Sequence, residues 1–271
     1  MRKLYLFMIL LGSVAPLSAQ SWFSLTQPLS LAGTSATDNR RQGLFQNPAL
    51  AAGLASPLLY AEYERRYDIT ELASKGLRFS YPFSHFTSSI DLRYSGFSAY
   101  HEILTGLGFA RDFGGKFSLG LQFILDTRYA VESDAYYSSF YPQIGLCVPL
   151  TPNLLLAVTV INPYLVQIKY ETDVRSLPSV YSMGLKLRIS DAVDWRLQAD
   201  QEISNKLRWG TAIDCSWFSS ILLQVGVQYS GFFVPGLGAG FRYRKLQFDL
   251  TTGLHPLLGL TIAGGVSYQI N

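Results

Sequence analysis

The stretch LTIAGGVSYQI, residues 260–270, alternates apolar side chains with polar or small ones. One phase holds Leu260, Ile262, Val266, Tyr268 and Ile270, and the other holds Thr261, Ala263, Gly265, Ser267 and Gln269. Successive side chains of a β-strand point to opposite faces, so this period of two predicts a strand with one apolar and one polar face.

The same alternation recurs along most of the chain. It is clear in residues 117–126, 193–198 and 246–254. Further segments of this kind begin near Leu58, Gly76, Thr87, Glu102, Tyr141, Asn153, Val180, Leu207, Leu222 and Gly236, which gives about fourteen strands. Each is roughly 8 to 14 residues long, and a tilted strand needs about 9 to 11 residues to cross a bilayer.

The connections between these segments alternate in length. Very short ones, such as PFSHF (82–86) and LTPN (150–153), take turns with longer ones, of which residues 161–178 are the longest. Short turns at one end and longer loops at the other are typical of outer-membrane barrels. We therefore expect an all-β fold, a transmembrane up-and-down antiparallel barrel of about fourteen strands over residues 57–271.

The two phases differ in charge, and this difference predicts that the apolar phase faces lipid and the polar phase faces the lumen. The apolar phase carries almost no charge at mid-strand, where Arg or Lys would cost about 2 to 4 kcal/mol in lipid. Aromatic residues gather near the strand ends, as in interfacial girdles. The polar phase supplies the expected charged lumenal lining: Asp91, Arg93, Asp126, Arg128, Asp194, Arg196, Asp214, Arg242 and Asp249. A periplasmic sandwich or a closed soluble barrel remains the alternative.

The N-terminus and the composition fit an exported protein. Residues 1–19 run basic, apolar and then small, the order of a signal peptide, so we expect cleavage near Ala19 and an outer-membrane location. No later apolar run reaches the length of a spanning helix. Charged residues make up 15% of the chain and the net charge is only +3, which argues against a nucleic-acid partner.

Few residues point to chemistry. Cys147 and Cys215 belong to opposite strand faces, which predicts free thiols. None of the three histidines lies in a nucleophile motif, and no His, Cys or acidic cluster has metal-ligand spacing. We therefore expect no enzymatic activity, no metal and no cofactor. A catalytic His101–Glu102 site at the outer rim is the alternative.

Residues 20–56 precede the first strand and are rich in small residues. A barrel of about fourteen strands has a lumen too wide for its wall side chains to fill. We therefore interpret residues 20–56 as a hatch folded into the lumen, with Arg40 and Arg41 facing the lumenal aspartates. A periplasmic tail is the alternative.

The motif FQNPALAA, residues 45–52, resembles the Asn-Pro-Ala element near the N-terminus of FadL-type outer-membrane barrels. The matching residues are Asn47, Pro48 and Ala49. That superfamily includes long-chain fatty acid transporters and the PorV and PorQ proteins of the type IX secretion system. The resemblance implies a fourteen-stranded barrel. The sequence departs from the pattern in its modest loops and in its end, Ile270–Asn271, which lacks a terminal aromatic residue.

Two functions follow from this interpretation. The first is passage of a hydrophobic small molecule, with the apolar lumenal residues Leu104, Ile124, Leu155 and Leu222 as guest contacts, unless they only pack against the hatch. The second is a scaffold that binds proteins of a secretion or surface-attachment complex through residues 161–178. The Asp and Arg residues of the lumen could form a selectivity lining or a proton path, but such residues more often neutralise one another across strands.

Overall fold

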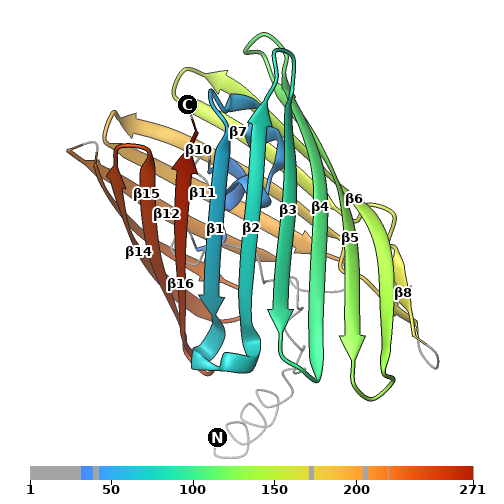
Figure 1. Ribbon diagram of the computed structural model, residues 1–271. Helices are drawn as coiled ribbons and strands as arrows, with labels where there is room; N and C mark the ends of the chain where they lie inside the picture. Colours follow the sequence, from blue (N-terminus) through green and yellow to red (C-terminus); the bar gives the residue numbers. More distant parts are fainter. Residues whose placement is uncertain (1–31, 39–42, 171–173, 204–206, 219, 271) are drawn as a thin grey trace, which may run out of the picture.

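The computed structural model describes residues 32–38, 43–170, 174–203, 207–218 and 220–270. The signal peptide, its cleavage near Ala19, and Arg40 and Arg41 lie outside these residues. Fourteen antiparallel strands form a closed barrel (Figure 1). The barrel strands are β1 (Leu58–Arg65), β2 (Ala73–Pro82), β3 (Thr87–Gly96), β4 (Tyr100–Asp112), β5 (Ser118–Ala130), β6 (Ala135–Thr151), β7 (Leu154–Ile161), β10 (Val180–Ser190), β11 (Val193–Glu202), β12 (Arg208–Trp217), β13 (Ile221–Tyr229), β14 (Phe233–Tyr243), β15 (Leu246–His255) and β16 (Gly259–Gln269).

Each barrel strand pairs with the barrel strands that precede and follow it in the chain, β7 pairing with β10, and the barrel closes between β1 and β16. Leu58 lies opposite Gln269 and Arg65 lies opposite Ile262 in the closing pair. Closure leaves no strand edge with unpaired backbone groups, which is the condition for a sheet to exist in hydrocarbon. The expected strand number and the up-and-down topology are confirmed.

Strand lengths differ from the expectation at the loop end of the barrel. β6 begins at Ala135 rather than near Tyr141, and β2 begins at Ala73 rather than near Gly76. Backbone pairing continues there beyond the segment in which apolar side chains alternate, because hydrogen bonds in a ladder do not depend on side-chain polarity. In these two strands, side-chain alternation therefore marks the apolar middle and misses the outer part.

The apolar phase faces outward, as the alternation predicts. Leu250 is 56% exposed whereas its neighbour Thr251 is 1% exposed, and Ile90 and Ser89 differ in the same way. Cys147 is buried on the inner face, Cys215 lies on the outer phase of β12, and both thiols are free, as expected. No helix in the described part of the chain is long and apolar enough to cross a bilayer.

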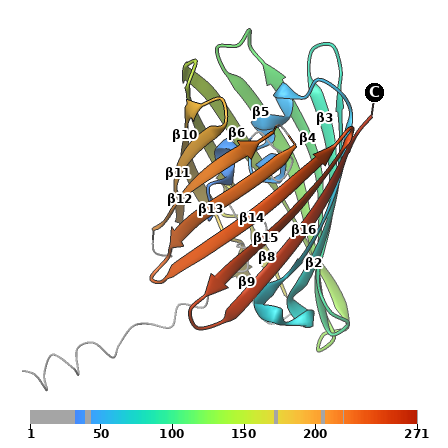
Figure 2. The same ribbon diagram turned by 90° about the vertical axis from the view of Figure 1, so that its left-hand side faces the viewer.

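The N-terminal segment, which we define as residues 32–38 and 43–56, lies inside the barrel (Figure 2). It forms three short 3-10 helices, η2 (Ser35–Thr37), η3 (Gly43–Phe45) and η4 (Pro48–Gly53). Asn47 caps η4, since its side chain accepts a hydrogen bond from the Ala49 amide, and Pro48 occupies the first position of the helix. Leu44, Ala49 and Ala51 pack with Leu58, Ala110 and Cys147 in one apolar cluster.

Two glycines on the inner wall make room for η4. A Cβ atom at Gly120 of β5 would collide with the backbone of Pro48 and Ala49. A Cβ atom at Gly145 of β6 would meet the Asn47 side chain and the Ala49 amide. The inner surface of this part of the wall is therefore shaped to receive backbone, not a side chain.

The longest loop is partly folded into the lumen. Residues 162–179 contain the two-stranded hairpin β8 (Gln167–Lys169) and β9 (Val174–Ser176), and β8 contacts β6. Ile168 and Leu177 are fully buried against Ile124, Tyr141 and Ile161 of the barrel wall. This loop was expected to offer an outer contact surface. Part of it instead packs into the lumen, because Ile168 and Leu177 meet the apolar residues Ile124, Tyr141 and Ile161 of the inner wall, whereas Tyr164, Leu165 and Val174 remain exposed.

Candidate binding cavity in the lumen

The inner wall carries ion pairs that cross strands. Arg78 of β2 lies 3.2 Å from Asp91 of β3, and Arg128 of β5 lies 2.8 Å from Glu102 of β4 and also 2.8 Å from Asp126 of its own strand. Arg196 of β11 lies 2.5 Å from Asp214 of β12. Arg78 and Arg196 are both fully buried. These pairs neutralise charge that would otherwise be buried without compensation.

The wall also holds the N-terminal segment by direct contacts. Arg196 forms a second ion pair at 3.2 Å with Asp38 of the segment. Arg78 donates a hydrogen bond to the Leu44 carbonyl, and Gln143 donates one to the Gln46 carbonyl at 2.6 Å. The wall therefore supplies the arginines, and the segment supplies a carboxylate and carbonyl groups.

Asn47 connects the two parts of the segment to the wall. Its amide nitrogen donates to the Ala36 carbonyl at 2.8 Å and approaches the Cys147 sulfur at 3.2 Å. The Ala36 amide in turn donates to Gln198 of β11 at 2.8 Å. Asn47, Pro48 and Ala49, the residues of the hatch motif, thus pack into the wall itself.

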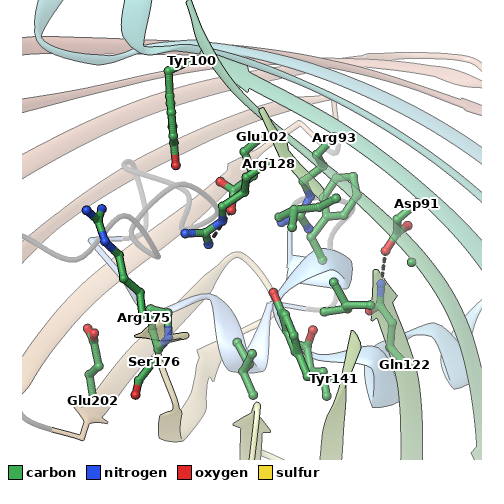
Figure 3. A pocket seen from close by; sticks show the side chains of 17 residues that line it. Asp91, Arg93, Tyr100, Glu102, Gln122, Arg128, Tyr141, Arg175, Ser176 and Glu202 are labelled. Carbon is green, nitrogen blue, oxygen red and sulfur yellow. Dashed lines mark hydrogen bonds and ion pairs between the residues drawn. The ribbon is translucent and has the colours of Figure 1, made fainter. Parts of the chain in front are cut away.

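A cavity of about 270 Å³ lies between the N-terminal segment and the hairpin loop (Figure 3). Phe45 of the segment lines it from one side, and Arg175, Ser176 and Pro178 of the hairpin loop line it from another. The remaining lining residues come from the wall and from the end of β11: Asp91, Arg93, Tyr100, Glu102, Leu104, Gly106, Gln122, Ile124, Arg128, Tyr141, Gln143, Ile161 and Glu202.

The cavity wall has an apolar part and a charged part. Leu104, Ile124 and Ile161 supply aliphatic surface, and Tyr141 is 1% exposed beside them. The charged part includes the Arg128–Glu102 ion pair and Arg93, whose guanidinium carbon lies 4.0 Å from the centroid of the Phe45 ring. A cation over an aromatic face is a stabilising contact, so Arg93 holds Phe45 at the cavity.

Asn162 fastens the hairpin loop over the cavity. Its side-chain nitrogen donates to the carbonyls of Val166, Leu177 and Pro178 at 3.5, 3.0 and 3.4 Å, and its side-chain oxygen accepts from the Val166 amide at 2.9 Å. Its φ of 51° lies in the left-handed region, which asparagine tolerates better than most residues. One side chain therefore joins the beginning and the end of the loop.

The structure brings together only some of the residues that the sequence suggested. Asp91, Arg93, Arg128, Leu104 and Ile124 line the cavity, and Asp126 lies behind Arg128. The remaining predicted residues lie elsewhere in the lumen: Leu155 packs against the apolar cluster of the N-terminal segment, Leu222 adjoins Gly240, Asp194 lies 4.0 Å from Arg188, and Arg242, Asp249 and Gln247 form a hydrogen-bonded group.

Several cavity residues were not predicted from the sequence. Phe45 lies two residues before Asn47 of the hatch motif, and Tyr141 and Gln143 occupy the inner phase of a strand that the alternation had already predicted from Tyr141 onward. Arg78, the ion-pair partner of Asp91, belongs to the inner phase of β2. Arg175 and Pro178 gave no such signal, because a loop has no alternation that predicts its path.

The alternative catalytic site at His101 and Glu102 is contradicted by the geometry. Glu102 points into the lumen toward Arg128, whereas His101 points outward and stacks between Tyr94 and Tyr129 with ring centroids 5.4 and 5.0 Å away. Adjacent residues of one strand face opposite sides of the sheet, so the two cannot act on one substrate. Within the described ranges, no three His, Cys, Asp or Glu side chains are grouped as metal ligands.

Comparison with known proteins shows the fold. No family model and no curated protein matches the sequence. The structure of the Pseudomonas putida toluene transporter TodX matches 90% of this chain and 96% of its own, with 10% identity and a TM-score of 0.66. A Pseudomonas aeruginosa FadL homologue matches 91% of this chain and 98% of its own, with 12% identity and a TM-score of 0.65. The chain is thus a closed fourteen-stranded antiparallel barrel with a FadL-like fold.

Proposed function

We propose that this protein is an outer-membrane barrel that passes small, mainly apolar molecules through the cavity beside Phe45. The cavity carries the proposal: it lies inside a closed barrel, between the N-terminal segment and the hairpin loop, where a guest entering from the loop end would be held. The likeness of the fold to a toluene transporter and to a FadL homologue supports the same class of function.

The outer surface supports a membrane location. Large apolar side chains such as Ile90, Met183 and Leu250 are more than half exposed on the outward phase. Aromatic residues are exposed at both ends of the strands, with Phe83 and Phe113 at the short turns and Phe97 and Phe233 at the loops. A surface of this kind is unfavourable in water and suits the acyl chains and interfaces of a bilayer. Outer-membrane lipid is therefore the proposed partner of this face.

The volume and lining of the cavity favour a small guest. About 270 Å³ is near the lower limit of ligand pockets, so the cavity suits a molecule of one or two rings better than a long acyl chain. Aliphatic and aromatic side chains would supply most of the contact, and the polar groups around Arg93 and Arg128 would orient the guest.

In this proposal residues 20–56 act as the hatch. The ion pair between Asp38 and Arg196 and the hydrogen bond between Arg78 and Leu44 keep its described part in the lumen. A guest would leave the cavity when these contacts shift, or through a gap in the wall.

The scaffold function has no comparable support. It depends on residues 161–178 as an outer contact surface, and only part of this loop offers one, since Ile168 and Leu177 are buried in the lumen while Tyr164, Leu165 and Val174 are exposed. The resemblance to the barrels of the type IX secretion system rests on the motif at Asn47, Pro48 and Ala49 alone.

Entry of an uncharged naphthylamine dye into Gram-negative host cells tests the proposal, because the fluorescence of the dye rises once it passes the outer membrane. Cells that make the protein should take up the dye faster than cells with an empty vector. Leu104→Trp should abolish the difference, since it fills the cavity. Leu222→Trp is the matched control, an inward-facing leucine outside the cavity. If the protein does not accelerate entry, the passage function must be abandoned.

A further inference from the structure

Arg93 is a cation of the lumenal cavity that the barrel wall leaves without an acidic partner. It lies on the inner phase of β3 and lines the cavity (Figure 3). Asp91 and Glu102, which also line the cavity, are paired with Arg78 and Arg128. No carboxylate of the described residues forms an ion pair with Arg93, and its Nε has no hydrogen-bond partner among them. A half-buried cation in this state is completed best by an anion.

Phe45 fixes the direction in which this cation can bind. The guanidinium carbon of Arg93 lies 4.0 Å from the centroid of the Phe45 ring. An arginine stacks on a ring through its planar face, whereas its N–H donors lie in the plane, at the edge. The contact with Phe45 therefore uses the face of the guanidinium and leaves its edge for an acceptor. A carboxylate matches such an edge, because its two oxygens accept two parallel hydrogen bonds.

Glu62 is the wall carboxylate that could compete with a guest for this cation. Glu62 of β1 and Arg93 of β3 both lie opposite Gly76 of β2, one on each side. Glu62 instead accepts a hydrogen bond from Tyr60 and forms no ion pair with Arg93 among the described contacts. It also does not line the cavity. Its charge therefore acts on Arg93 only from a distance, and the guanidinium edge stays open to a guest.

Apolar surface lies directly beside the guanidinium. Leu104 of β4 is the cross-strand neighbour of Arg93 on the inner face. Ile124 of β5 and Tyr141 of β6 lie opposite each other on the next two strands, and all three side chains line the cavity. A flat ring can pack against these side chains while a group attached to it reaches Arg93. The cavity thus combines one open cation with a surface for one apolar body.

We propose that the guest of this cavity is a small aromatic carboxylate. Its carboxylate binds the edge of the Arg93 guanidinium, and its ring lies against Leu104, Ile124 and Tyr141. This inference rests on the proposed passage of small molecules and names their chemical class. An uncharged hydrocarbon of the same size would fill the apolar part of the cavity but would leave Arg93 without a counter-charge.

Equilibrium dialysis of the full mature chain in detergent tests this class, with protein-free micelles as the blank. It compares para-toluate with para-toluamide, which has the same ring and no charge. The wild type should bind one para-toluate per barrel about tenfold more tightly than para-toluamide. Arg93→Gln should weaken the binding of para-toluate about tenfold and leave that of para-toluamide unchanged. Glu62→Gln should strengthen the binding of para-toluate about threefold, because it removes a repulsive charge.

Arg242→Gln is the matched control. Arg242 is a lumenal arginine that donates to Gln247 and does not line the cavity, so this variant should bind both compounds as the wild type does. A heat-modifiability gel verifies that each variant is a folded barrel. Equal affinity of the wild type for the two compounds, or unchanged binding of para-toluate by Arg93→Gln, would overturn this inference and leave the passage function standing. Binding of neither compound would overturn this inference and also remove the cavity as a guest site.

Discussion

At the scale of single residues, Arg196 has the largest expected effect on stability. It is fully buried and neutralises both Asp38 of the N-terminal segment and Asp214 of β12. Replacement by methionine would remove the guanidinium from between two buried carboxylates, so we expect Arg196→Met to lower the free energy of unfolding in detergent by about 3 to 5 kcal/mol. Asp38→Asn, which leaves the Asp214 pair intact, should cost clearly less. Equal stabilities of the wild type and Arg196→Met would contradict this account of the lumen.

Gly120 is a second residue with a defined role, because any side chain there meets the backbone of Pro48 and Ala49. We expect Gly120→Val to displace η4 while the barrel still closes, which makes the N-terminal segment sensitive to protease. Gly264→Ala is the control, since its Cβ would find only the Asp249 carbonyl at 3.7 Å. Limited proteolysis followed by mass spectrometry measures the difference. Equal protection in both variants would mean that η4 does not depend on this wall contact.

For the lumenal charged residues, the sequence predicts the direction of each side chain but not its partner. The inward direction of Asp91, Asp126 and Arg196 follows from strand phase alone. Their partners do not, because the pairing of Arg196 with Asp38 joins the wall to a segment without alternation. The hatch was expected to supply arginines to lumenal aspartates, whereas its described part supplies a carboxylate to a lumenal arginine.

At the scale of elements, the hairpin loop lines the cavity, and Asn162 holds the loop in place. Asn162→Gly places at this position a residue that tolerates a φ of 51°. The substitution removes the side-chain hydrogen bonds by which Asn162 joins the beginning of the loop to its end. We expect faster dye entry in cells carrying this variant, with the barrel stability changed by only about 1 to 3 kcal/mol. Asn162→Ala should destabilise the loop further, since alanine is strained at this φ. Unchanged dye entry in both variants would exclude the loop as a barrier.

The loop also marks a limit of the sequence-based prediction at this scale. Alternation located the strands, and the short turns followed from their spacing. The inward path of residues 162–179 depends on Ile168 and Leu177 finding Ile124, Tyr141 and Ile161 on distant strands. Contacts of this kind are set by three-dimensional packing, which a local pattern does not encode.

At the scale of the whole molecule, the number of strands, their order and the outward face could be predicted, because period-two alternation repeats over fourteen segments and a barrel must close. The contents of the lumen could be predicted only in kind. A wide barrel requires filling, but the division of that space between the N-terminal segment, the hairpin loop and a cavity of about 270 Å³ depends on the fold.

The central claim is that the outward phase contacts acyl chains and the charged phase is enclosed. Single cysteines carrying a bimane label, introduced on a background without Cys147 and Cys215, test it in liposomes. Labels at Ile90 and Leu250 should be quenched by lipids brominated on their acyl chains, whereas labels at Ser89 and Thr251, buried on the inner phase, should not. Quenching of all four labels by aqueous iodide, with none by brominated lipid, would contradict the account.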